Sequence, residues 1–317
     1  VAILVPMLLF GKLDNVYIQL LLVSTVWLGL IGGLDDYIKV FRHRKEGLKG
    51  RFKIVGQVGL GVIVGTTMWL SPDIVVREKV TQPVQTVYLN ENGTVLETVQ
   101  RHVVVSSESL KTTQTTIPFV KNNEFDYGWL TGGNSVATWI LYVLVAIFVV
   151  TAVSNGANLT DGLDGLSSSV TLPVCAFFAA AFGWAWVKWQ QSGTAGMAVF
   201  AAALFGGLVG FLVYNHYPAK VFMGDTGSLF LGGAVCGMAF ALDMPLILIL
   251  VGIIYILETL SDILQVGYFK LTHGKRIFRM APLHHHLELG GWSEVKLFCV
   301  FSGVTLLACV LAFLGVM

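Results

Sequence analysis

Three aspartates stand where apolar runs of the sequence begin or end. Asp35 and Asp36 follow one run directly, and Asp225 lies in the turn Gly224-Asp225-Thr226-Gly227 that opens another. Paired carboxylates suit metal binding or proton abstraction, and a Gly-rich turn at a helix start offers free N–H groups to phosphate. Since Mg²⁺ is usually held by one or two carboxylates plus phosphates, we expect these acids to be catalytic, with Asp225 as the Mg²⁺ ligand. A simpler interpretation, in which they only cap or mark helix ends, stays open.

A second polar stretch runs from Asn155 to Gly165. Its amide and acid side chains recur every third residue, at Asn155, Asn158, Asp161 and Asp164. On a helix this spacing lines one face, and the glycines between them permit close approach of a ligand to the backbone. An EF-hand loop is excluded because its closing Glu is absent. The stretch therefore predicts a ligand-binding face.

Histidines and lysines complete the polar groups. Three consecutive histidines, His284 to His286, cannot all face one ion from a regular helix, so phosphate contact or proton handling suits them better than zinc. Lys39 and Lys53 could neutralise a polyphosphate or could only set membrane topology. Glu258 and Asp262 lie one helical turn apart in an apolar run, where functional and structural interpretations are equally open.

The composition tells which kind of protein must position these groups. The chain has 317 residues, of which 55% are apolar and 12% charged, about half the charge of a soluble domain. This excludes a disordered chain, a coiled coil and a typical soluble enzyme. The net charge of +1 excludes a general nucleic-acid binder. We expect an all-α polytopic membrane protein. Because residue 1 is Val, inside an apolar run, we also expect the natural N-terminus to be missing.

Apolar windows locate the expected helices. Eight windows are long enough, or nearly so, to cross a bilayer, and residues 1–10 look like the end of a ninth helix. The eight windows are 16–34, 54–70, 136–153, 169–187, 195–213, 227–241, 245–268 and 295–317.

The basic residues orient these helices. The loops that carry the acidic and histidine motifs hold twelve Lys and Arg, whereas the opposite side holds seven. The positive-inside rule then places the motifs on the cytoplasmic side. Segment 71–135 falls outside, where alternating residues around Asn90-Glu91-Asn92-Gly93 predict a small β-hairpin. We therefore divide the chain into helices 1–70, a periplasmic insertion 71–135 and helices 136–317.

Together the motifs resemble the polyprenyl-phosphate N-acetylhexosamine-1-phosphate transferases. The resemblance covers residues 1–317 apart from the insertion. It is carried by Asp35-Asp36-Tyr37-Ile38-Lys39, by Asn155 through Gly165, by Gly224-Asp225-Thr226-Gly227, by Ala281-Pro282-Leu283-His284-His285-His286, and by Glu258-Thr259-Leu260-Ser261 with Gln265. Asp262 stands where the family pattern has an apolar residue. The family has ten helices, so the resemblance implies about nine in this chain.

The resemblance implies a Mg²⁺-dependent transfer of a phospho-sugar to a lipid phosphate in the bacterial inner membrane. The uninterrupted histidine triplet favours UDP-MurNAc-pentapeptide as donor and undecaprenyl phosphate as acceptor, giving lipid I and UMP in peptidoglycan synthesis. Asp225 would hold Mg²⁺, and Asp35 or Asp36 would deprotonate or orient the acceptor. A homodimer is left open.

The resemblance also implies a set of substrate-binding residues. Phe222 would stack on uracil, and His284 and His285 would contact phosphate or sugar. The full set is Lys39, Lys53, Asn155, Asn158, Asp161, Gly162, Leu163, Asp164, Asn215, Phe222, Gln265, Ala281, His284, His285 and His286.

Two other functions compete with this one. The first is a sister transferase that uses UDP-GlcNAc as donor and shares the acidic motifs. The second is a secondary transporter, which would place its polar residues near the middle of the membrane rather than at helix ends.

Overall fold

The computed structural model describes residues 3–44, 46–89, 95–120, 123–189 and 193–316. The chain forms two compact units. One is a helical unit made of the residues up to Leu70 and from Thr113 onward, and the other is Ser71–Thr112.

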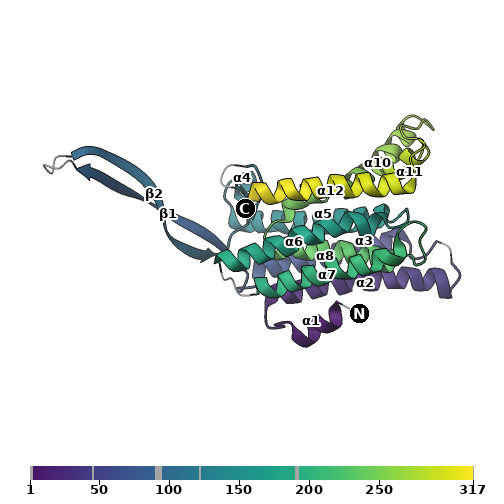
Figure 1. Cartoon of the computed structure of the whole chain (residues 1–317), viewed down its shortest axis with the longest axis horizontal. Coiled ribbons are helices and arrows are strands. Elements are labelled where there is room, and N and C mark those ends of the chain that lie inside the picture. The colour runs from purple at the N-terminus through teal and green to yellow at the C-terminus, as the bar shows by residue number, and fades with distance from the viewer. Residues whose placement is uncertain (1–2, 45, 90–94, 121–122, 190–192, 317) are drawn as a thin grey trace. The chain divides into compact units, whose positions relative to one another are not determined.

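The helical unit is a bundle of long helices (Figure 1). Its helices are α1 (Leu4–Phe10), α2 (Val16–Phe41), α3 (Gly50–Leu70), α4 (Gly128–Thr131), α5 (Ser135–Thr160), α6 (Leu166–Trp189), α7 (Thr194–Asn215), α8 (Gly224–Ala241), α9 (Leu248–Val251), α10 (Ile253–Leu271), α11 (Leu283–Glu288) and α12 (Glu294–Val316), with a 3₁₀ turn at Pro245–Ile247 before α9.

The apolar windows of the sequence coincide with these helices. Among the described residues, α2, α3, α5, α6, α7 and α12 are long and apolar enough to cross a membrane. Many of their side chains are both apolar and exposed, as expected of a surface that faces lipid. The expected all-α polytopic architecture is thereby confirmed.

Window 245–268 is not one straight helix. Pro245–Val251 and Ile253–Leu271 meet at an angle of 81° at Gly252. Proline at the start and glycine at the break are the residues at which helices bend. The bend carries α10 away from the line of the first segment.

Helix α8 is the core of the bundle. It packs against α2 and α5, and it is buried continuously from Leu231 to Ala241. Close packing rests on small residues, as is common between membrane helices. At Gly32 of α2, a Cβ atom would lie only 2.8 Å from Thr226 Cα. The α2 backbone therefore touches the first turn of α8 directly.

The second unit is an antiparallel hairpin of β1 (Val76–Leu89) and β2 (Val95–Leu110), with irregular register at Val80/Thr81 and Tyr88/Leu89. This confirms the β-hairpin predicted from the alternating residues, although its turn at 90–94 lies outside the described residues. The separate unit ends at Thr112, so it is shorter than the expected insertion 71–135. Strands β3 (Gln114–Thr116) and β4 (Glu124–Asp126) belong to the helical unit, where Thr116 N–H donates to Asp243 O at 3.0 Å.

The glycine contact between α2 and α8 gives a test of this packing. We expect Gly32→Ala to lower the free energy of unfolding by about 1–3 kcal/mol, because its methyl group would push the two backbones apart. Thermal unfolding in detergent would measure the loss.

Gly33→Ala is the matched control, since a Cβ at Gly33 would meet only Thr226 Oγ1, at an ordinary 3.8 Å. Equal melting temperatures for the two variants would show that the helices do not meet at Gly32.

Candidate active site

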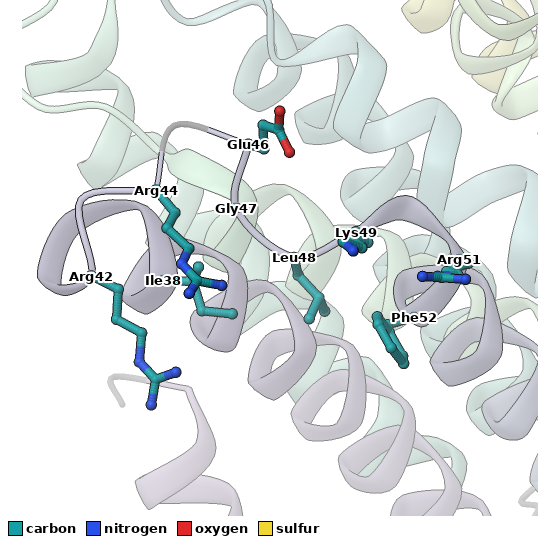
Figure 2. Close-up of a pocket in the computed structure, with 9 residues that line it drawn as sticks. All are labelled: Ile38, Arg42, Arg44, Glu46, Gly47, Leu48, Lys49, Arg51 and Phe52. Carbon is teal, nitrogen blue, oxygen red and sulfur yellow. The ribbon is translucent and has the colours of Figure 1, made fainter.

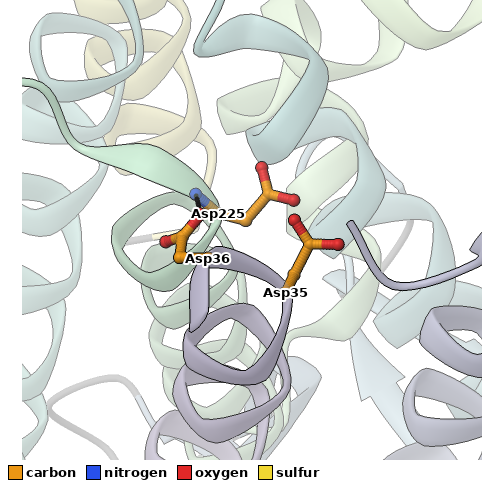
Figure 3. A group of neighbouring side chains, drawn as sticks. All are labelled: Asp35, Asp36 and Asp225. Atoms are coloured by element: carbon orange, nitrogen blue, oxygen red, sulfur yellow. Dashed lines mark hydrogen bonds between the residues drawn. The ribbon is translucent and has the colours of Figure 1, made fainter. Parts of the chain in front are cut away.

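Three carboxylates gather where the end of α2 meets the start of α8 (Figure 3). Asp35, Asp36 and Asp225 each offer one oxygen, and these atoms lie within 4.8 Å of one another. Asp35 is fully buried, whereas Asp36 and Asp225 are half-buried. The aspartates singled out in the sequence thus form one cluster.

The two neighbouring aspartates of α2 have different surroundings. Asp36 accepts hydrogen bonds from the backbone N–H of Asp225 (3.2 Å) and of Thr226 (2.8 Å), and from the Thr226 hydroxyl (2.5 Å). These N–H groups belong to the first turn of α8, where backbone N–H groups have no acceptor within their own helix. The cap of α8 therefore comes from Asp36 on α2, and not from Asp225 itself. Asp36 fixes the turn that carries Asp225.

Two lysines balance the charge of the other two carboxylates. Lys39 Nζ lies 2.5 Å from Asp35 Oδ2 and 3.1 Å from Asp225 Oδ2. Lys53 Nζ lies 3.0 Å from Asp35 Oδ1 and 2.5 Å from Asp225 Oδ2. Each ammonium therefore bridges both helices. Lys53 extends this network to α3.

Asp225 stays ionised in this network. Burial alone would raise the pKa of its carboxyl, but hydrogen bonding with Asp35, Lys53 and Asn158 and the charge of Lys53 outweigh burial and hold the pKa well below its usual range. Asn158 Nδ2 donates to Asp225 Oδ1 at 3.0 Å and also to Ser228 Oγ at 2.8 Å. The side chain of Asn158 thus aligns the Asp225 carboxylate from the α5 side.

The cluster has the chemistry of a divalent-cation site. All its ligand atoms are carboxylate oxygens, which Mg²⁺ prefers. Asp35 Oδ2 is buried and, although Lys39 is close, has no hydrogen bond of normal geometry. The residues present therefore fit a Mg²⁺ ion, with Asp225 the more accessible ligand.

The stretch after Asn155 does not line one helix face as expected. Helix α5 ends at Thr160, so Asp161 is its C-cap and Asp164 lies in the following turn. Gly165, directly before α6, adopts a φ of +71°, a conformation that glycine takes at low cost. Burial, with repulsion from Asp225 and Asp36, raises the pKa of Asp161 to about 7. Asp161 therefore feels the charge of the cluster although it is not part of it.

Several expected substrate-binding residues hold loops in place through their own polar groups. Asn155 Nδ2 donates to Gln57 Oε1 on α3, at 2.9 Å. Asn215 is buried between Ser168 Oγ and Val221 O, and Asp164 Oδ2 accepts from Ala219 N–H at 2.8 Å. Gln265 binds the backbone of Ile277 and Phe278. Asn215 and Asp164 thus hold loop 216–223, and Gln265 holds loop 272–282.

The three histidines have three different partners, in keeping with the argument against a shared zinc ion. His284 is fully buried, with Nδ1 2.9 Å from Glu258 Oε2 and its backbone N–H donating to Glu258 Oε1 at 3.2 Å. His285 Nδ1 lies 3.0 Å from Glu288 Oε2. His286 Nδ1 accepts from Arg279 N–H at 3.0 Å.

His284 reaches the loop that follows α5. A Cβ atom at Gly162 would overlap the His284 ring at Nε2, so only glycine fits there. His284 Nε2 is buried and has no hydrogen-bond partner in the described structure. The ring thus connects the histidine motif to the Asp161–Asp164 turn.

The remaining expected residues differ in exposure. Phe222 is 74% exposed in the loop before α8, which leaves its ring free to stack on a planar ligand. Leu163 and Ala281 are half-buried in their loops.

Comparison with known proteins identifies the family. The model of glycosyl transferase family 4 matches residues 18–243. This chain belongs to that family. A phospho-N-acetylmuramoyl-pentapeptide-transferase of Parabacteroides distasonis is 48% identical over 93% of this chain and 72% of its own length. Those of Flavobacterium psychrophilum (44% identical) and Amoebophilus asiaticus (46%) match over 98% of this chain and 78% of their own lengths. The resemblance that the motifs indicate is confirmed.

Some hydrogen-bond partners of the site residues could not be predicted from the sequence of this family member. Glu258 stood between functional and structural interpretations, and the structure makes it the buried partner of His284, whereas Asp262 one turn later is half-exposed. Gln57, Ser228 and the backbone N–H of Leu48, which donates to Asp35 Oδ1 at 2.7 Å, gave no sequence signal. Only Glu258, an acidic residue within an apolar run, gave a sequence signal that it has a specific partner.

The raised pKa of Asp161 predicts a pH-dependent stability. In the unfolded chain Asp161 loses its proton near pH 4, whereas in the folded protein it keeps the proton up to about pH 7. The protonated carboxyl therefore stabilises the fold at low pH, and this contribution to stability falls as pH rises from about 4 to about 7. Relative to Asp161→Asn, the wild type should lose a few degrees of melting temperature between pH 5 and 7.5.

Melting curves of both proteins without Mg²⁺, recorded across that range, would measure the difference. Parallel curves would mean that Asp161 ionises normally.

The Glu258–His284 pair predicts a second loss of stability. Glu258→Ala would leave two buried donors of His284 unpaired, at a cost of about 1–3 kcal/mol. Glu258→Gln should lose less, since its amide oxygen still accepts one hydrogen bond. Chemical or thermal unfolding compares both with Asp262→Ala. If Glu258→Ala and Asp262→Ala unfold alike, the pair does not stabilise the fold.

Proposed function

We propose that the protein transfers phospho-MurNAc-pentapeptide from UDP-MurNAc-pentapeptide to undecaprenyl phosphate, giving lipid I and UMP. The observation that carries the proposal is the cluster of Asp35, Asp36 and Asp225 with Lys39 and Lys53, at the ends of apolar helices. The printed name of the relatives favours this donor over UDP-GlcNAc.

The reaction is a displacement at phosphorus. An oxygen of the acceptor phosphate forms a bond to the sugar-linked phosphorus of the donor. The bond from that phosphorus to the oxygen it shares with the second phosphate breaks, and its electron pair leaves with UMP. Because several anionic phosphates must meet, positioning and charge neutralisation supply most of the catalysis.

Lys39 and Lys53 are the residues that neutralise these charges. Each already faces two carboxylates, and the half-buried position of both leaves room for a phosphate at the same cations. A phosphate monoester has a second pKa of about 6, so the acceptor is largely a dianion at pH 7. Asp35 therefore orients Lys39 and Lys53 rather than removing an obligatory proton, and Asp36 holds the Asp225 turn.

Asp225 would hold Mg²⁺, with Asp35 as the neighbouring carboxylate. When bound, the ion neutralises the diphosphate and stabilises the negative charge on the departing UMP. Around this centre, Asn158 aligns Asp225. Phe222 stacks on uracil, and the turn from Asp161 to Asp164 surrounds the nucleoside.

The charge distribution supports a position in the bacterial inner membrane with this site facing the cytoplasm. The basic residues of the loops gather at the end of the bundle that carries the cluster, as the positive-inside rule requires. A water-soluble nucleotide sugar and a lipid phosphate can meet there.

Release of UMP tests the proposal. The purified enzyme, supplied with undecaprenyl phosphate and Mg²⁺, should release UMP from UDP-MurNAc-pentapeptide but not from UDP-GlcNAc. Asp225→Asn and Asp35→Asn should lower the rate by at least about 100-fold, since each removes a charge from the reacting centre. Asp262→Asn, half-exposed on α10, is the matched control and should keep the wild-type rate.

Two results would contradict the proposal. UMP release from UDP-GlcNAc alone would assign the sister reaction. Full Mg²⁺-dependent turnover in both Asp225→Asn and Asp35→Asn would remove the cluster from the chemistry.

A further inference from the structure

A pocket outside the carboxylate cluster opens between the end of α2 and the start of α3 (Figure 2). Its volume is about 550 Å³. Four cations line it, Arg42, Arg44, Lys49 and Arg51, against the single acid Glu46. The pocket therefore carries a strong surplus of positive charge.

In the part of the chain that the structure describes, these cations are not engaged in ion pairs. None of the four forms an ion pair with a carboxylate there, and the Arg51 guanidinium lies over the Phe52 ring, 5.6 Å from its centroid. Unpaired cations around a concave surface attract an anion, and arginine binds phosphate with particular geometric fit.

The other walls of the pocket are apolar, from Ile38, Leu48 and Phe52. Beside it, the helix ends expose Phe41 (70%) and Val55 (68%), on helices apolar enough to cross a membrane. Basic groups directly next to exposed apolar side chains mark the depth at which lipid tails end and headgroups begin. The expected anion is therefore one attached to lipid.

The pocket does not include the carboxylate cluster, but one segment of its wall contacts Asp35. None of the three aspartates, nor Lys39 or Lys53, lines the pocket. Its wall includes Gly47 and Leu48, and Leu48 N–H donates to Asp35 Oδ1. Gly47 has a φ of +59°, and a Cβ there would lie 2.6 Å from the same oxygen. A ligand in the pocket would thus press on the segment that holds Asp35.

We propose that this pocket binds the phosphate headgroup of an anionic membrane phospholipid, of the phosphatidylglycerol type, and that the bound lipid steadies residues 46–48 against Asp35. Binding of the lipid does not depend on the transfer reaction proposed above.

Removal of two cations tests the site. We expect Arg42→Gln/Arg44→Gln to weaken phosphatidylglycerol binding by roughly 30-fold, since each basic residue near an anionic lipid contributes about a factor of five. Native mass spectrometry of the delipidated protein titrated with phosphatidylglycerol measures the affinity. Thermal unfolding with and without the lipid measures the stabilisation that the variant should lose.

The matched control is Lys270→Gln/Lys275→Gln, which removes the same charge from exposed residues around the end of α10. It should bind the lipid as the wild type does. Equal binding by the Arg42/Arg44 variant and the wild type, or an equal loss in the control, would overturn the proposal.

Two further arms exclude the reaction's own substrates. Displacement of phosphatidylglycerol by equimolar undecaprenyl phosphate would assign the pocket to the acceptor. A higher KM for UDP-MurNAc-pentapeptide in phosphatidylcholine vesicles, confined to the Arg42/Arg44 variant, would assign it to the carboxylates of the donor peptide. Either result overturns the proposal, whereas lipid binding by a protein without transferase activity would contradict only the proposed function.

Discussion

The site depends on keeping two carboxylates, Asp35 and Asp225, side by side against their mutual repulsion. The ammonium groups of Lys39 and Lys53 each bridge both carboxylates. Removing one partner of a buried ion pair typically costs 3–5 kcal/mol, because the remaining charge is left uncompensated. The geometry of α2, α3 and α8 is therefore tied to this charge balance, and phosphates that enter would meet the same cations.

Packing brings these charges to their positions. The absence of a side chain at Gly32 lets the α2 backbone touch the start of α8, and only then can Asp36 reach the N–H groups of Asp225 and Thr226. On the other side, Asn158 at the end of α5 binds the same Asp225 carboxylate. Asp225 is thus held through its backbone by α2, and through its side chain by residues of α2, α3 and α5.

The sequence could predict much of the fold because lipid imposes a simple requirement. Every backbone group must be satisfied inside its own helix, so long apolar runs identify the helices directly. The angle at Gly252 and the end of the separate unit at Thr112 depend instead on tertiary packing. The hydropathy of the sequence shows neither where a helix bends nor where the separate unit ends.

For the site, the sequence could predict which residues lie at the same end of the bundle, but not which side chains contact each other. Charge counting placed Asp35, Asp225 and His284 together, since topology alone decides the end at which each loop lies. The partner of each side chain depends on distances that spacing does not encode. A spacing of three suggested one helix face from Asn155 to Asp164, but the helix ends at Thr160. From the sequence Asp36 could not be distinguished from Asp35, but in the structure Asp36 caps the start of α8.

The account stands on the cluster being one divalent-cation site, and manganese binding followed by electron paramagnetic resonance tests this most directly. Mn²⁺ replaces Mg²⁺ at carboxylate sites and its signal changes on binding. One Mn²⁺ should bind the wild type in the presence of UMP, and Asp225→Asn should abolish that binding. An unchanged Mn²⁺ affinity in Asp225→Asn would contradict the account.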